Sequence, residues 1–232
     1  MSVSSKDEDL LESLRFCLRL TNSITPVSNG RGRIYRRLQW SNRVFYDWLV
    51  SIGLTPAKTL TLGPVAVPEK YFPDFFRGCI DGDGSILVYT DRYHAPKNDR
   101  YVYQRLYVSL VSASRPFLDW VRTEVRQLLG VHGVVEAKFT QGRRPIWTLR
   151  YAKGESLRLL PWMYYASGVP SLARKREKAQ AFIAGLGRGM LATSAGVAKL
   201  ADATDSKSVA RKGIGVRLPS PAPFLTILRA SL

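Results

Sequence analysis

Two carboxylates separated by one glycine, Asp81 and Asp83, are the residues most suited to chemistry in this sequence. The apolar residues before them recur at the spacing of one helix face: Phe75, Phe76, Cys79 and Ile80. Hard divalent cations take oxygen ligands, and a helix C-terminus adds free carbonyl groups and the negative end of the helix dipole. The pattern therefore predicts a Mg²⁺ site suited to phosphodiester hydrolysis, in which a bound metal activates water and offsets developing charge.

The segment Asp81–Gly84 has two other interpretations. An EF-hand calcium loop needs Gly and Glu at positions where this chain has Ile86 and Arg92, so that loop is excluded. The remaining alternative is an ordinary turn that ends a helix and binds no metal, which is the commoner meaning of such a motif in isolation. Three features favour the metal site: the preceding Phe-Phe-x-Gly-x-Ile, the basic strands that follow, and an internal duplication.

The residue pattern also predicts the elements that position this motif. We expect a helix over Tyr71–Gly84, followed by strands at about Leu87–Tyr93 and Tyr101–Val111. Along the second strand, polar and aromatic residues alternate with apolar ones, so one face packs on the core and the other stays exposed. Thr59–Glu69 contains two prolines and is typical of a linker.

The chain contains a duplication. Ser5–Leu14 resembles Ser112–Val121, and each segment begins an amphipathic helix after residues that favour an N-cap. A glycine-containing hairpin and a further helix follow in each copy: Ile24–Trp40 and Arg43–Ile52 in the first, Val134–Tyr151 and Gly154–Ala166 in the second. Only the second copy has a helix and two strands in front.

The expected fold class is therefore α+β, a duplicated αββαββα unit with antiparallel sheets in which the first repeat is truncated. We expect residues 1–58 to form the C-terminal half of the first repeat, 59–69 a linker, and 70–184 the complete second repeat. Residues 185–232 are expected to form a poorly ordered tail, because all five Trp and all 11 Tyr precede them.

The composition limits the kinds of partner and the cellular compartment that we expect for this protein. The formal net charge is +17, of which +12 falls on residues 1–184, and such an excess of cations favours a nucleic acid as partner. Cys17 and Cys79 are too few for a disulfide framework, so we expect a reduced cytoplasmic or organelle interior. His94 and His132 lie near no Cys pair, which excludes a Cys/His zinc site. No apolar run is long enough to span a membrane, so no membrane partner is expected.

Phe76–Gly84 resembles the signature motif of the LAGLIDADG homing endonucleases, and residues 5–184 resemble a member with two repeats in one chain. Motif, element order and duplication all agree with this resemblance. In that family the signature helices lie side by side at the centre, each ends in one catalytic acid, and two saddle-shaped sheets hold the DNA major groove. The resemblance implies a Mg²⁺-dependent endonuclease that serves intron or intein mobility.

The resemblance also implies roles for single residues. Asp83 matches the metal-binding catalytic acid, the Gly82 carbonyl matches a backbone metal ligand, and Asp81 matches the more structural acid of the motif. Lys175 matches the family's lysine that stabilises charge at the scissile phosphate, and Lys58 is its counterpart in the first repeat. The alternative interpretation is that each lysine is only a solvated charge at the end of a helix.

One departure from the family pattern is large, because this sequence has one signature motif where two-repeat enzymes have two. The missing half-unit would precede Ser5, so we expect a truncated reading frame or a wrongly chosen start codon. Cleavage of both strands by this chain alone is then not expected. The family type predicts a monomer, and a dimer formed through the single motif helix is the alternative that supplies a second acid.

Cations and aromatic residues on the expected strands form the candidate surface for double-stranded DNA. Arginine side chains read base edges in the major groove, and the remaining cations hold phosphates. The expected contacts are Arg31, Arg33, Arg36 and Arg37 in the first copy, and Tyr101, Tyr103, Arg105, Tyr107, Lys138, Arg143, Arg144 and Arg150 in the second. DNA binding is therefore expected to weaken strongly with salt.

Ala195–Ser208 resembles the conceptual translation of a bacterial-type tRNA gene, and Gly215–Ser220 fits codons of its T-arm. We therefore expect the tail to be a tRNA-gene read-through without a selected function. A second function also stays open for the whole chain: a non-cleaving binder of DNA or intron RNA, such as a maturase or a regulator. Asp83 favours the nuclease, whereas the single motif favours the binder.

Overall fold

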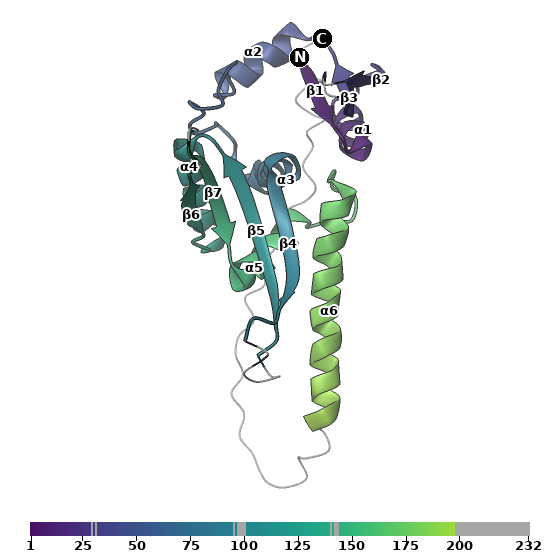
Figure 1. The fold of residues 1–232 in the computed structure, drawn as a ribbon. Coiled ribbons are helices and arrows are strands. Elements are labelled where there is room, and N and C mark those ends of the chain that lie inside the picture. The colour runs from purple at the N-terminus through teal and green to yellow at the C-terminus, as the bar shows by residue number, and fades with distance from the viewer. Residues whose placement is uncertain are drawn as a thin grey trace.

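The computed structural model describes residues 1–197 except 29, 31, 95, 97–100, 140, 142 and 143, and it describes side chains up to residue 186. Within these residues the strands form two antiparallel sheets, and helices cover one face of each (Figure 1). No helix in this part of the chain is long and apolar enough to cross a membrane.

The larger sheet belongs to the second repeat. Its strands have the order β4 (Gly84–Asp91), β5 (Tyr103–Ser112), β7 (Ile146–Tyr151) and β6 (Val134–Lys138). Its inner face packs on α3 (Phe72–Asp83), α4 (Arg115–Leu129) and α5 (Lys153–Met163). The expected alternation along β5 is confirmed, because Leu106, Val108 and Leu110 are buried in this core. The outer face of the larger sheet carries polar and aromatic residues together with exposed aliphatic ones, among them Leu87, Val134 and Ile146.

The smaller sheet belongs to the first repeat. Its strands have the order β1 (Ser2–Ser5), β3 (Ile34–Gln39) and β2 (Ile24–Ser28), and α1 (Glu8–Cys17) covers its inner face. A small core of Leu11, Leu38 and Trp40 holds this unit together. We did not expect β1, because three of its four residues are serines. Pairing with β3 stabilises it nonetheless.

The strands within each sheet pair in equivalent registers, so the duplication can be followed residue by residue. Leu38 lies between Val3 of β1 and Ile24 of β2, as Leu149 lies between Leu110 of β5 and Val135 of β6. Both central leucines are fully buried. A one-residue slip would move every side chain of a strand to the other face, so the shared register preserves inner and outer positions in both repeats.

The connecting segments depart from the expected domain division in two ways. The segment after α2 (Arg43–Ser51) packs on the second repeat, with Val65 buried in its core, so residues 59–69 do more than link. The helix α6 (Ala173–Val197) lies beside β4 and continues past residue 184 (Figure 1). Residues 185–197 thus belong to a helix, which Ala, Leu and Met favour, and the poor order expected for the tail stays a prediction. Residues 198–232 lie outside the described residues.

Candidate functional site

The motif helix α3 ends where the larger sheet begins. Pro73 lies in its first turn, and Phe72, Phe76 and Ile80 form its buried face at i, i+4 and i+8. Gly84 follows at once as the first residue of β4, and a Cβ there would meet the Ile80 Cα at 2.6 Å. Glycine is therefore required at this helix-to-strand junction, which holds the two motif carboxylates at a fixed end of the core.

Asp83 and Gly82 lie exposed at the end of α3. The Asp83 carboxylate makes no hydrogen bond or ion pair with any described residue, and nothing lies within 4 Å of a Cβ placed on Gly82. No cluster of three or more acidic, histidine or cysteine ligands occurs among the described residues. Mg²⁺ keeps several waters and binds through one or two carboxylates, so this open set of oxygen donors fits a hydrated Mg²⁺ ion.

Asp81 has a different environment from Asp83. Its side chain is buried, and one oxygen accepts a hydrogen bond from the Leu172 amide at 3.0 Å. Its other oxygen is buried without a hydrogen-bond partner among the described residues. Burial raises the pKa of the Asp81 carboxyl. Asp81 was predicted as a metal ligand and as the more structural acid, and its contacts favour the structural role.

Lys175 closes the end of α3 from the first turn of α6. Its ammonium donates to the carbonyl oxygens of Ile80, Asp81 and Gly84 at 2.6, 2.9 and 2.7 Å. An ammonium has three N–H donors, and these carbonyls take all of them. The side chain is 6% exposed, and burial lowers the pKa of its amine. In this arrangement Lys175 holds the motif in place and has no donor left for a phosphate.

Lys58 does not share this position, although it is the counterpart of Lys175 by sequence. It lies half-buried in the turn after α2, where its backbone carbonyl accepts from the amides of Thr61 and Leu62. Its side chain makes no hydrogen bond or ion pair with α3 within the described part of the chain. The structure therefore brings Asp81, Gly82, Asp83 and Lys175 together and leaves Lys58 apart from them.

A buried arginine fastens the middle of α3. The Arg77 guanidinium donates to the carbonyls of Pro170 and Met163 at 2.8 and 2.7 Å and pairs with Asp74 at 2.5 Å. The Tyr165 hydroxyl donates to the same Asp74 carboxylate. We did not identify Arg77 as a site residue from the sequence, since its signal, an arginine inside an apolar helix face, resembles an ordinary surface charge.

The first repeat docks beside this site through acidic residues at the start of α1. Arg174 donates to both oxygens of Asp7 at 3.0 and 2.9 Å, and the Ala173 amide donates to Asp9. The bond from Arg174 lowers the pKa of the Asp7 carboxyl. The residues next to Lys175 therefore join the two repeats at the end of the motif helix.

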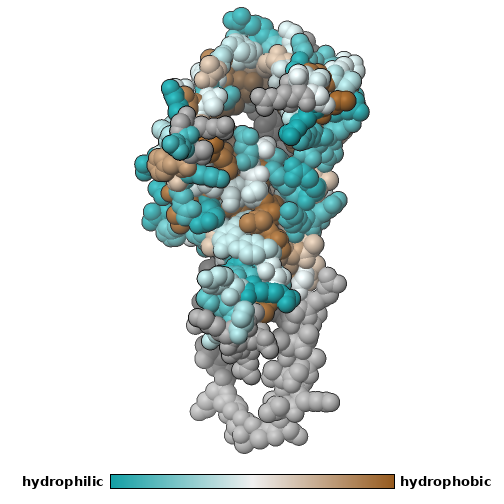
Figure 2. Space-filling view, viewed as in Figure 1, coloured by the Kyte–Doolittle hydropathy of each residue, from teal (hydrophilic) through white to brown (hydrophobic). Residues whose placement is uncertain are grey.

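The outer faces of the sheets carry half of the twelve predicted DNA contacts. Tyr103, Arg105 and Tyr107 of β5 and Arg150 of β7 lie on the outer face, as expected from their alternation with buried residues. The face in view in Figure 2 is mostly hydrophilic, with hydrophobic residues scattered between. Arg105 and Arg150 each pair with a carboxylate, of Asp91 and Glu136 respectively. We did not predict either carboxylate from the sequence, because the partner of a residue on a neighbouring strand depends on the register of the two strands.

The predicted cations of the hairpins separate into several groups. Arg37 lies on the outer face of β3 and donates to the Ser4 hydroxyl, whereas Arg36 points to the helix side and pairs with Glu8 of α1. Both were predicted to contact DNA, but they do not share one face of β3, because neighbouring strand residues point to opposite faces. Arg33, Tyr101, Lys138 and Arg144 are exposed. Arg31 and Arg143 lie outside the described residues.

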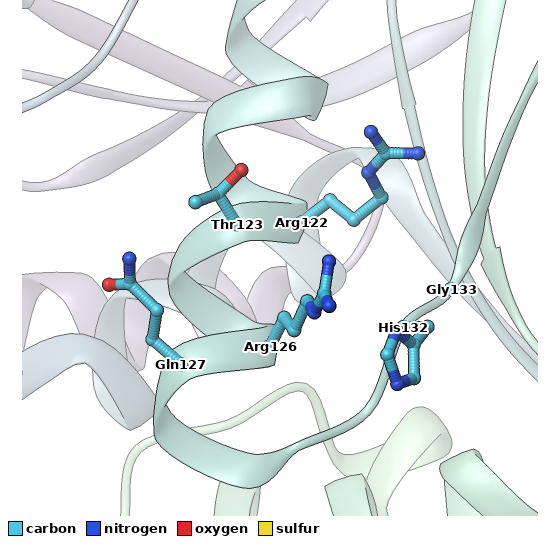
Figure 3. Close-up of a pocket in the computed structure, with 6 residues that line it drawn as sticks. All are labelled: Arg122, Thr123, Arg126, Gln127, His132 and Gly133. Carbon is cyan, nitrogen blue, oxygen red and sulfur yellow. The ribbon is translucent and has the colours of Figure 1, made fainter.

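A pocket of about 470 Å³ lies on the outer side of α4, away from the motif. Figure 3 shows two guanidinium groups, of Arg122 and Arg126, extending from the helix toward the loop that carries His132. Arg122 pairs with Asp119 on the same helix. None of the motif residues lines this pocket, so it is separate from the candidate site.

No protein-family model and no curated protein sequence matches this chain. Among solved structures, it is similar to the LAGLIDADG meganuclease I-AabMI bound to uncleaved DNA, with a TM-score of 0.52, 15% identity, and coverage of 86% of this chain and 85% of that chain. It is also similar to the I-SmaMI LAGLIDADG homing endonuclease bound to cleaved DNA, with a TM-score of 0.51, 14% identity, and coverage of 86% and 82%. The chain therefore has the LAGLIDADG homing endonuclease fold, as its motif and duplication predicted.

Proposed function

We propose that this chain is a site-specific DNA endonuclease of the homing type, which hydrolyses phosphodiesters with Mg²⁺ and serves intron or intein mobility. The observation that carries the proposal is the exposed Asp83 carboxylate beside Gly82 at the end of α3, within this fold. The carboxylate has no protein partner among the described residues, and an uncommitted acid at the end of a rigid helix is suited to bind a hard cation.

The chain's own residues would supply position and charge. Asp83 and the Gly82 carbonyl would hold Mg²⁺, which when bound activates water and offsets the charge that develops on the phosphate. Lys175 and Arg77 fix α3 at its end and its middle, so that Asp83 stays in a defined place relative to the sheet. The outer faces of the two sheets would hold the duplex, with arginines near base edges and lysines near phosphates.

The sequence holds a single Asp-Gly-Asp-Gly motif, so we expect one strand to be cut in each binding event. The test is a nicking assay on supercoiled plasmids that carry the DNA flanking this gene, in the presence of Mg²⁺. The wild-type chain should convert supercoiled plasmid to the open circle, and Asp83→Asn should not. Asp119→Asn, on the exposed side of α4, is the matched control and should keep full activity.

A second candidate function is a non-cleaving binder of DNA or intron RNA. Two of the predicted site residues favour it, because the Asp81 carboxylate is buried and the Lys175 ammonium has no free donor. If salt-sensitive binding occurs and neither the wild-type chain nor Asp83→Asn nicks DNA with Mg²⁺, the binder is correct and the nuclease is wrong.

A further inference from the structure

Two arginines on the outer face of the larger sheet are held in the same way. Arg105 of β5 is the first, and its Nε and Nη2 both lie 2.9 Å from one Asp91 oxygen on the neighbouring strand. Its guanidinium also lies over the Tyr103 ring, 5.3 Å from the centroid. Asp91 accepts a further bond from the Tyr93 amide, and these bonds lower the pKa of its carboxyl. A ring and a fixed carboxylate therefore orient Arg105.

Arg150 of β7 repeats this arrangement with residues from different strands. Its Nη2 donates to Glu136 of β6 at 2.7 Å, and its guanidinium lies over the Tyr107 ring, 5.5 Å from the centroid. The Tyr107 ring in turn stacks on Tyr89 at 6.4 Å. Each triplet thus contains a tyrosine, an arginine and a carboxylate. We call them the Arg105 triplet (Tyr103, Arg105, Asp91) and the Arg150 triplet (Tyr107, Arg150, Glu136).

The triplets leave each guanidinium able to bind a second partner. Arginine has five N–H donors in a rigid fork, and each of these two arginines donates one hydrogen bond to its carboxylate. The Nη1 end of each group is uncommitted among the described residues. The two arginine side chains stay 41% and 45% exposed. Two parallel donors match the O6 and N7 acceptors of guanine, which makes this the commonest specific contact in the major groove.

Pairing with carboxylates also changes how these arginines contribute to binding. A cation that serves only to hold phosphates gains nothing from a neighbouring acid, which lowers the local positive potential and repels the backbone. An exposed ion pair adds little stability, so fold stability is a weak reason for the two acids. An acid that orients a guanidinium instead favours a single direction of donation, which is what base readout requires.

We propose that Arg105 and Arg150 each read one guanine in the major groove, and that Asp91 and Glu136 are positioning residues that aim them. This inference rests on the proposed binding of double-stranded DNA and adds the bases that the larger sheet selects. Arg105 and Ser109 lie four residues apart on β5, and Ser109 pairs with Arg150. At about 3.4 Å per strand residue and about 3.4 Å per base pair, the two guanines lie about four base pairs apart.

The test is selection of bound sequences from a pool of randomised duplex DNA, carried out with the full chain and its variants. The wild-type chain should enrich guanine at two positions, each by about tenfold over the other bases. Arg105→Ala should remove one preference and Arg150→Ala the other. Asp91→Asn and Glu136→Gln should weaken the preference of their own arginine only. Because each removes a negative charge, overall affinity for the pool should rise at the same time.

Lys138→Ala is the matched control, since Lys138 lies on the same face without a carboxylate partner in the described part of the chain. It should weaken binding to all sequences alike and change no preference. If the arginine variants behave like Lys138→Ala, both arginines hold phosphates and the inference is wrong, while the proposed DNA binding stands. If the wild-type chain retains no duplex at low salt, both the inference and the proposed function are wrong. Thermal unfolding of each variant should match the wild type.

Discussion

The ammonium of Lys175 is the single group whose removal tests the architecture of the site most directly. We expect Lys175→Met, which keeps the length of the side chain and removes its donors, to lower the free energy of unfolding. Each hydrogen bond to a charged group contributes about 1.5–3 kcal/mol, and Lys175 makes three. Lys175→Met also removes the cost of burying an ammonium, which is several kcal/mol and offsets part of this loss. The expected net loss is therefore about 2–4 kcal/mol.

The measurement is urea unfolding followed by tryptophan fluorescence. Trp120 and Trp162 contact Phe72 of α3, so their emission reports on the packing of the motif helix. The midpoint should fall without a change in the slope of unfolding free energy against urea. Lys178→Met is the matched control, because Lys178 is exposed in the same helix and its replacement should change stability by about 0.5 kcal/mol or less.

A Lys175→Met variant that costs no more than Lys178→Met would refute this reasoning. The ammonium would then not be committed to the end of α3, and the sequence-based role at the scissile phosphate would regain support. A large loss of stability would instead mean that reduced cleavage by Lys175 variants reports a displaced Asp83. Activity alone therefore cannot assign the role of this lysine, and stability has to be measured beside it.

Three further outcomes follow from the same structure. Affinity for duplex DNA should fall by about tenfold or more between 50 and 300 mM salt, as measured by fluorescence anisotropy, and unchanged affinity would contradict an electrostatic DNA surface. The lowered pKa of Asp7 should stabilise the fold above about pH 4 and lose that effect as the pH falls through the folded-state pKa; Asp7→Asn should flatten this part of an acid unfolding curve. Leu11→Ala should cost about 2–5 kcal/mol, seen as early melting of the first repeat, whereas Phe16→Ala, at an exposed position, should cost little.

Local patterns in the sequence predicted the inner and outer faces of the strands well. The alternation of Leu106, Val108 and Leu110 with polar residues needs only the two-residue period of a strand, which any window of sequence reveals. The same period separates Arg36 from Arg37. Although the two arginines are adjacent in the sequence, Arg36 points toward α1, so the two do not form one surface.

Contacts between distant segments could not be predicted in this way. The partners of Lys175 are carbonyls of α3 and β4, and backbone groups leave no trace in residue types. The pairing of Arg150 with Glu136 depends on the register of β6 against β7, which the hairpin sequence between them leaves open. The sequence therefore reveals the motif of the site, whereas the long-range contacts that hold the motif in place are known only from the structure.

The common register of the two sheets has a consequence for protein engineering. Gln39 of β3 occupies the position that Arg150 holds in β7, since each lies one residue beyond the central leucine of its strand. Equivalent positions of the two sheets thus display different amino acids, so we expect the DNA target of this chain to be asymmetric. Side chains can also be exchanged between equivalent positions as modules. Gln39→Arg together with Thr25→Glu, at the counterpart of Glu136, would transfer the Arg150–Glu136 pair from the larger sheet to the smaller one.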